Sequence, residues 1–131
     1  MIKYFIYILV FFCLTINAQT SNEEKKVYNT VDEMPSFPKG TEAMMKFIQK
    51  KIIFPKSAIE KKIIGKCFLT FVVEPDGSIK DITVRKGVEN CSECDEAAID
   101  VISKMPKWNP GKKDGVPVSV YFNLPINFKY K

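Results

Sequence analysis

Histidine is absent from this chain of 131 residues, and its absence excludes several kinds of active site. Neither a Ser-His-Asp triad nor a Cys-His pair can be assembled without it. A zinc site within one chain needs four ligands, whereas only Cys67, Cys91 and Cys94 follow the apolar start of the chain. The chain also has no glycine-rich phosphate loop and no pair of carboxylates in a catalytic motif. We therefore expect no enzymatic activity, no metal site and no cofactor.

The balance of apolar and charged residues predicts a folded domain rather than a disordered chain. Hydrophobic residues make up 46% of the sequence and charged residues 27%, which are ordinary values for globular proteins. The formal net charge is +5, and the lysines occur as scattered pairs instead of one basic cluster. This distribution is typical of solvated surfaces, so we expect no nucleic-acid partner.

Residues 1–18 have the pattern of a secretory signal peptide. Lys3 supplies the basic start, residues 4–16 form an apolar run, and Ala18 provides a small residue for cleavage. The run is shorter than the ~20 residues that a membrane-spanning helix needs. A short uncleaved signal anchor is the alternative, because Ile16 occupies a position where cleavage sites prefer a small residue. The pattern therefore predicts export from the cytoplasm, with membrane anchoring if the leader is retained.

The remaining chain divides into an extended N-terminal segment, residues 19–40, and a folded domain, residues 41–131. In the first segment, prolines and a glycine surround Met34 and Phe37, which we expect to pin it to the domain. Hydrophobic periodicity then predicts three helices, with Thr41 and Ser92 as the N-cap candidates of the first and the third. Pro55 lies in the first turn of the second helix, which we expect to bury Ala58, Ile59 and Ile63 and to end with Gly65 as its cap.

The same periodicity predicts three strands at residues 66–74, 79–84 and 116–128, with a tight turn at 74–78 in which Gly77 takes a positive φ. In the first strand Cys67, Leu69, Phe71 and Val73 share one face, and a shift of parity in the second strand predicts a bulge near Lys80-Asp81. This order indicates a small two-layer α+β domain whose three-stranded antiparallel sheet carries the helices on one face.

The last predicted strand, residues 116–128, is apolar at every even-numbered position. Pro117 and Pro125 have the same parity, so the two missing N–H groups lie along one side of the strand. Because proline is tolerated in sheets mainly at edges, we expect this side to be open. An open edge can accept a strand from another chain. The predicted peptide-binding edge is the segment between the prolines: Val118, Ser119, Val120, Tyr121, Phe122 and Asn123.

Cys91 and Cys94 have the C-x-x-C spacing at the start of the third predicted helix. We expect either a short Cys91–Cys94 disulfide or two free thiols there, since export permits disulfides. Thiol oxidoreductases use the same spacing, so a small exported redox protein acting through this pair is an alternative function. The position of Cys94 on the apolar face of its helix favours a packed sulfur.

Several short motifs follow one another along the chain: Phe54-Pro55, Ile64-Gly65, Phe71-Val72-Val73, Pro75-Asp76-Gly77, Ala97-Ala98 and Trp108-Asn109-Pro110-Gly111. Together with Glu33-Met34-Pro35-Ser36-Phe37-Pro38 and Asn123-Leu124-Pro125-Ile126, they resemble a TonB C-terminal domain of the Bacteroidetes type. The resemblance extends over nearly the whole chain after the leader. Each motif is weak alone, and their order and spacing carry the likeness.

The resemblance implies a periplasmic domain that binds an N-terminal peptide segment of TonB-dependent outer-membrane receptors by strand addition. By position, residues 118–123 correspond to the binding edge. Family members transmit energy from an inner-membrane proton-driven complex to those receptors. They have an uncleaved membrane helix and a long spacer, whereas the leader here has the pattern of a cleavable one and we expect only a short segment between it and Thr41. Peptide binding in support of transport is therefore the function that we expect, and self-association into a homodimer through the same edge is an alternative.

Overall fold

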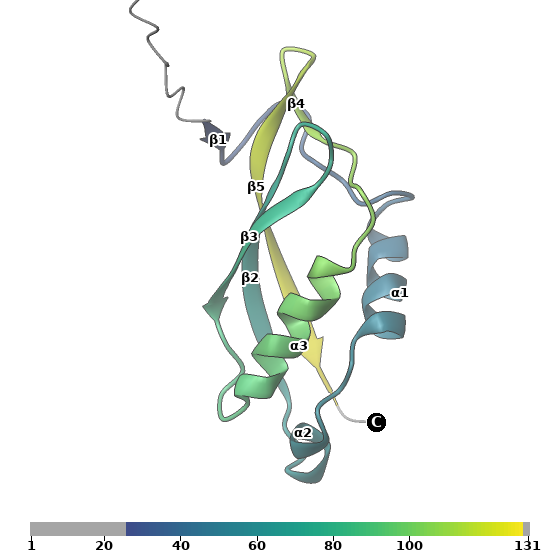
Figure 1. Cartoon of the computed structure of the whole chain (residues 1–131), viewed down its shortest axis with the longest axis vertical. Coiled ribbons are helices and arrows are strands. Elements are labelled where there is room, and N and C mark those ends of the chain that lie inside the picture. The colour runs from purple at the N-terminus through teal and green to yellow at the C-terminus, as the bar shows by residue number, and fades with distance from the viewer. Residues whose placement is uncertain (1–25, 130–131) are drawn as a thin grey trace, which may run out of the picture.

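The computed structural model describes residues 26–129, so the predicted signal peptide lies outside the described residues. Figure 1 shows an elongated α+β domain with the hairpin of β4 and β5 at one end and helix α2 at the other. The elements in chain order are β1 (Val27–Tyr28), α1 (Thr41–Lys51), α2 (Lys56–Glu60), β2 (Gly65–Val73), β3 (Ile79–Lys86), α3 (Ser92–Ser103), β4 (Gly111–Lys113) and β5 (Val116–Phe128).

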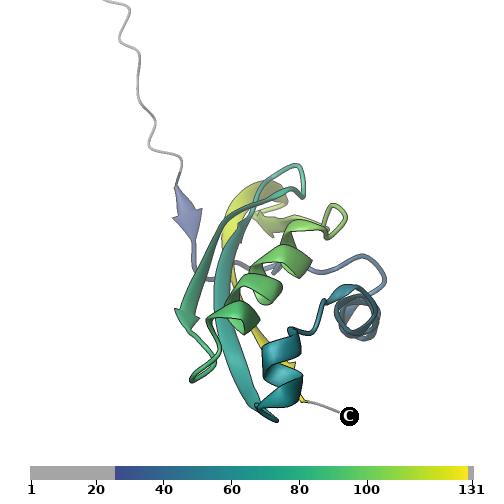
Figure 2. The same cartoon turned by 60° about the horizontal axis from the view of Figure 1, so that its bottom comes forward.

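The sheet contains the three predicted antiparallel strands and two short strands that the sequence did not reveal. The strand order is β1-β5-β2-β3, and β4 pairs with the beginning of β5. Because β1 runs parallel to β5, the sheet is mixed, and the prediction of a purely antiparallel three-stranded sheet was incomplete. The three helices lie on one side of the curled sheet, as predicted (Figure 2).

Strand β2 forms the centre of the fold because its alternating apolar side chains enter the core. Cys67, Leu69, Phe71 and Val73 are all buried, in agreement with their predicted common face. The apolar stripe of α3 belongs to the same core and consists of Cys94, Ala98, Val101 and Ile102. The apolar face of β2 and the apolar stripe of α3 therefore pack into one core, as their sequence patterns predict.

The turn between β2 and β3 is held by Trp108, which comes from the segment after α3. Gly77 has φ 87°, the positive value that favours glycine, and its carbonyl accepts a hydrogen bond from the Trp108 N–H at 2.8 Å. The indole packs against aromatic rings, with centroid distances of 4.8 Å to Phe122 and 5.3 Å to Phe71. This contact ties the turn, β2 and β5 together.

Helix boundaries differ from the predictions at several termini. Gly40, not Thr41, is the N-cap of α1, and Cys91, not Ser92, is the N-cap of α3. Helix α2 ends at Glu60, where Lys61 is its C-cap, so Gly65 is the first residue of β2 instead of a helix cap. These differences are confined to termini, where the conformation of one or two residues depends on tertiary contacts.

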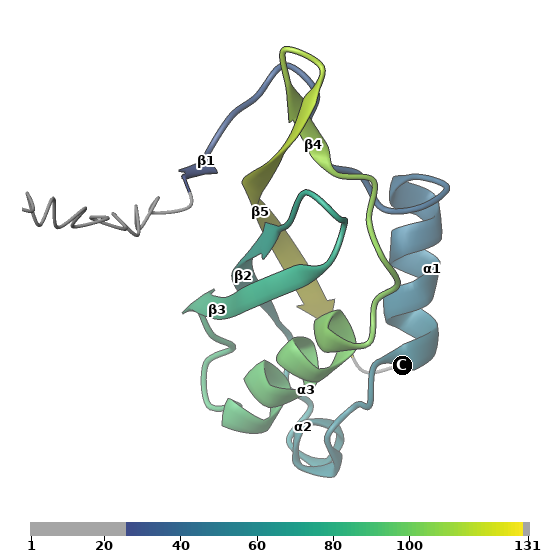
Figure 3. The same ribbon diagram turned by 45° about the horizontal axis from the view of Figure 1, so that its top comes forward.

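The segment before α1 follows an extended path over the β4–β5 hairpin (Figure 3). Glu33 and Lys112 exchange two backbone hydrogen bonds of 3.1 and 2.8 Å, and Ser36 and Asn109 do the same. Phe37 is buried in the core, as predicted, whereas the side chain of Met34 is 45% exposed. The segment is thus attached mainly by its backbone and one aromatic ring.

Candidate functional site

The side of β5 that faces away from β2 is the region where the sequence predicts peptide binding. On its inner side, β5 pairs with β2 in an uninterrupted antiparallel register from Phe128 opposite Gly65 to Val120 opposite Val73. Pro125 lies opposite Phe68, and Pro117 lies opposite Lys112 of β4. Neither proline has an N–H to donate. The backbone hydrogen bonds of β5 to β2 and β4 are therefore made by the even-numbered residues.

The structure corrects the position of the open stretch. Val118 pairs with Gly111 of β4, while Ser119 and Val120 lie opposite Val27 and Tyr28 of β1. Only the second half of the predicted edge, Tyr121, Phe122 and Asn123, has strand pairing on the β2 side alone among residues 26–129. Within this part of the chain the unpaired side continues along β5 through residues 121–128, past Pro125.

The prediction placed the edge too early because β1 cannot be recognised from sequence. Two residues, Val27 and Tyr28, are too few to show a period of two. The parity of Pro117 and Pro125 identifies the side of β5 on which two N–H groups are missing. It gives no indication that another segment, β1, pairs with β5 between the two prolines. Residues 121–128 of β5 form the open edge.

The open edge is neutral and largely polar on the face away from the helices. Residues 121–128 contain no charged side chain. Tyr121 is 36% exposed, and the Asn123 side-chain oxygen accepts a hydrogen bond from the Thr70 hydroxyl at 2.8 Å. Arg85 on β3 in turn donates from Nε to Thr70 at 3.4 Å. These contacts hold the Asn123 side chain against the sheet.

The opposite edge of the sheet, formed by β3, is protected against strand addition. Its pairing with β2 contains two register shifts, and Asp81 within it has φ 53°. Four of its eight residues are charged: Lys80, Asp81, Arg85 and Lys86. Bulges and charges are the usual means by which edge strands avoid pairing. Of the two edges, the continuous and uncharged one on β5 is the better template for another strand.

Ser119 has a structural contact that the sequence did not indicate. Its hydroxyl donates a 2.8 Å hydrogen bond to the Glu74 carboxylate, and the Lys80 ammonium lies 2.7 Å from the other carboxylate oxygen. The hydrogen bond to Glu74 raises the pKa of Lys80. Ser119 and Glu74 are both buried. This side chain therefore fixes the beginning of the edge and is not available to a ligand.

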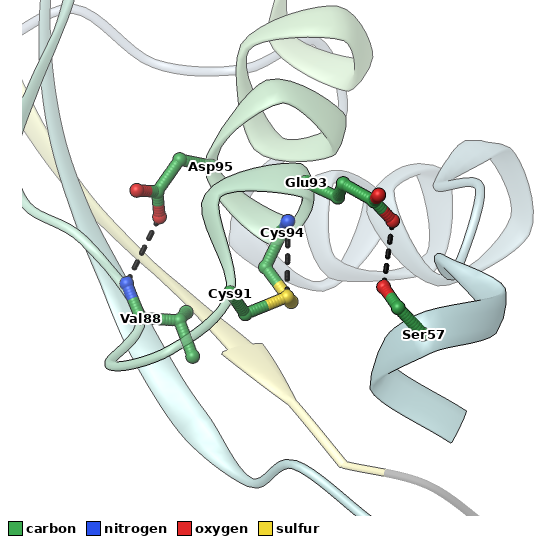
Figure 4. Close-up of a disulfide and its surroundings, with 6 residues drawn as sticks. All are labelled: Ser57, Val88, Cys91, Glu93, Cys94 and Asp95. Carbon is green, nitrogen blue, oxygen red and sulfur yellow. Dashed lines mark hydrogen bonds between the residues drawn. A yellow bond between two sulfur atoms is a disulfide. The ribbon is translucent and has the colours of Figure 1, made fainter. Parts of the chain in front are cut away.

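Cys91 and Cys94 form a buried disulfide at the N-terminus of α3 (Figure 4). The Cys91 sulfur also accepts a 3.1 Å hydrogen bond from the Cys94 N–H. Beside it, the Asp95 carboxylate accepts from the Val88 N–H at 2.9 Å and fixes the preceding loop. Reactive dithiols need an accessible sulfur. The burial of both sulfurs gives no support to the alternative redox function.

Cys67 is the free thiol of the described residues, and it is also buried. Burial, followed by the negative charge of nearby Asp95, raises the pKa of its thiol to about 12. A thiol with that pKa is neutral at physiological pH and is a poor nucleophile. Between residues 26 and 129, no group of three or more Cys, Asp or Glu side chains is arranged to hold a metal ion.

The fold is a small α+β module in which residues 121–128 of β5 pair on the β2 side alone within the described part of the chain. The family model described as Gram-negative bacterial TonB protein C-terminal matches residues 50–130. The chain therefore belongs to the TonB C-terminal domain family. This family is non-enzymatic, is associated with the bacterial envelope, and serves TonB-dependent transport through interaction with outer-membrane receptors.

Two solved structures of the Helicobacter pylori TonB C-terminal domain are similar to this chain. The NMR structure of residues 179–285 has 25% identity and a TM-score of 0.48, and the match covers 67% of this chain and 78% of the other. The structure of residues 194–285 has 24% identity and the same TM-score, with 67% and 90% covered. The comparison with curated proteins found no match. None of the helices in the described part of the chain is long and apolar enough to span a membrane.

Proposed function

We propose that this domain captures an extended N-terminal segment of an outer-membrane receptor as an additional strand on the open edge of β5. The observation that carries the proposal is that residues 121–128 have strand pairing on the β2 side alone within the described chain. An edge of this kind binds through main-chain hydrogen bonds, which suit a partner of variable side chains. Membership of a family that interacts with such receptors supplies the partner class.

The rigidity of β5 supports the same proposal. Nine consecutive residue pairs join it to β2 without a register shift, and Phe122 and Phe128 anchor it to other aromatic rings of the core. A template strand that is already ordered does not lose conformational entropy when a peptide pairs with it. The ordering cost then falls on the incoming segment alone.

We further infer that the domain acts in the periplasm. The predicted signal peptide directs export, although it lies outside the described residues. The Cys91–Cys94 disulfide is compatible with this location, because disulfides persist in oxidising compartments such as the periplasm.

A pair of substitutions at Asn123 tests the proposed edge. Both Asn123→Pro and Asn123→Ala remove the side chain that accepts from Thr70, but only proline removes the backbone donor. Residue 123 shares its parity with Pro117 and Pro125, so we expect the proline variant to fold. Binding of a synthetic receptor N-terminal peptide, measured by fluorescence anisotropy, should weaken about tenfold in the proline variant relative to the alanine variant.

Equal affinity of the two variants, with both shown to be folded by Trp108 fluorescence, would mean that the peptide does not pair with this part of β5. Binding that is lost equally in both variants would instead assign the effect to the Asn123 side chain. Either result contradicts the proposed edge.

A further inference from the structure

Strand β1 pairs with β5 directly beside the proposed receptor-binding edge, although it belongs to the same chain. Val27 pairs with Ser119 and Tyr28 with Val120, in parallel orientation. These two pairs lie directly before the open residues 121–128. An incoming strand that pairs with residues 121–128 and then extends toward Val120 would therefore meet β1.

Strand β1 is short and lies outside the hydrophobic core. The strand has only two residues, both half-buried, and neither belongs to the hydrophobic core. Its main side-chain contacts are cation–π, with the ammonium groups of Lys26 and Lys113 each 4.8 Å from the centroid of the Tyr28 ring. Such contacts are weak where the groups are solvated.

The chain that follows β1 is held independently of it. Glu33 and Lys112 exchange two backbone hydrogen bonds, as do Ser36 and Asn109, and Phe37 is buried. A released β1 would thus remain attached to the domain by the short stretch before Glu33. A strand on so short a tether has a high effective concentration at its binding site, so it returns readily when the edge is vacant.

From these contacts we propose that β1 is a displaceable internal strand, which pairs with residues 119–120 beside the open edge until a receptor segment extends its own pairing past Tyr121 and replaces it. This inference rests on the proposed function, because it concerns regulation of the same edge. When β1 is bound, the receptor segment cannot use this part of β5. Its apparent association constant is therefore the intrinsic constant multiplied by the fraction of molecules from which β1 is released. Bound β1 also shields main-chain groups that would otherwise pair with a second copy of the domain.

The test compares two double variants of the full chain. Val27→Pro/Tyr28→Pro removes both N–H groups of β1 and should release it. Asn29→Pro/Thr30→Pro places the same substitutions just beyond the strand and serves as the matched control. We expect a receptor N-terminal peptide to bind the first variant ~10-fold more tightly than the wild type, as for an edge vacant in about a tenth of molecules. The control variant should bind like the wild type.

A second probe separates the inference from the proposed function. A synthetic peptide of residues 24–32 of this chain should perturb the Ser119 and Val120 amide resonances of the Val27→Pro/Tyr28→Pro variant and leave those of the wild type unchanged. This result, combined with no receptor-peptide binding by any variant, would support the displaceable strand and refute the receptor function. Equal receptor affinity of both double variants and the wild type would overturn the displaceable strand while leaving receptor binding intact.

Discussion

The turn between β2 and β3 offers a test of how the fold is held together, through the substitution Gly77→Ala. Gly77 has φ 87°, and a Cβ added there would lie 2.1 Å from the Trp108 carbonyl oxygen. The Gly77 carbonyl oxygen also accepts the 2.8 Å hydrogen bond from the Trp108 N–H. Gly115, in the β4–β5 hairpin, also has a positive φ of 76°, but a Cβ there would meet no atom within 4 Å. Gly115→Ala is therefore a matched control.

Both substitutions place alanine at a positive φ, but only the Cβ at position 77 collides with the Trp108 backbone. Placing alanine at positive φ costs about 1 kcal/mol at either position. At Gly77 the Trp108 backbone must also move, which loses a hydrogen bond worth about 1 kcal/mol and disturbs a packed core at about 2 kcal/mol. We expect Gly77→Ala to lower the free energy of unfolding by about 4 kcal/mol, and Gly115→Ala by about 1 kcal/mol.

Urea unfolding followed by tryptophan fluorescence measures this difference, because the chain has one tryptophan and it is Trp108. The probe therefore reports on the contact that the substitution disturbs, and circular dichroism provides an independent signal for the whole domain. Equal losses for the two variants would refute the reasoning, since they would show that contact between the turn and Trp108 contributes nothing to stability.

Three further predictions concern charge and sulfur. Glu74 raises the pKa of Lys80 above its ordinary value of 10.5, so the stabilisation from this pair is complete below that pH and is lost as pH rises through the raised pKa. Urea midpoints of the wild type and Lys80→Met should therefore converge at alkaline pH, and a constant difference would contradict the pairing. With a pKa of about 12, roughly one Cys67 thiol in ten thousand is ionised at pH 8. Iodoacetamide should hence modify Cys67 only after unfolding, and rapid labelling of the native protein would be the contrary result. The double variant Cys91→Ser/Cys94→Ser should lose about 2 kcal/mol of stability, as expected for a very short loop, and an unchanged urea midpoint would show that the disulfide is dispensable.

The parts of the fold that sequence predicts well are those with long, regular patterns. The strand at residues 66–74 was predicted within one residue of β2, and residues 116–128 match β5. The turn with Gly77 at positive φ and the irregularity near Asp81 were also predicted correctly. In each case the pattern depends on local geometry and on one buried face, both of which are visible in the sequence.

The parts that sequence did not predict depend on contacts between distant residues. Strand β4, Gly111–Lys113, has no apolar alternation and forms because the Asp114-Gly115 turn, with φ of 51° and 76°, folds it back on β5. Ile59, expected in the buried stripe of α2, is 51% exposed because that helix is a single short turn that buries Ala58. Neither outcome follows from periodicity.

The peptide-binding edge stays a prediction, and its strand pairing alone can be compared with the structure. Proline parity correctly identified the side of β5 that lacks donors, since Pro117 and Pro125 retain their places in the ladder. The extent of the open edge depended on β1 and on the buried contact of Ser119 with Glu74, which lie far away in the sequence. The edge is consequently shifted toward the C-terminus, to residues 121–128.

Hydrogen exchange of the domain with and without a receptor N-terminal peptide tests the binding edge most directly. Strand addition to β5 should slow exchange of the Asn123 and Asn127 amides, which have the parity of the prolines, and should leave the β3 amides unchanged. Protection that appears along β3, or no change along residues 121–128, would contradict capture of a receptor segment by this edge.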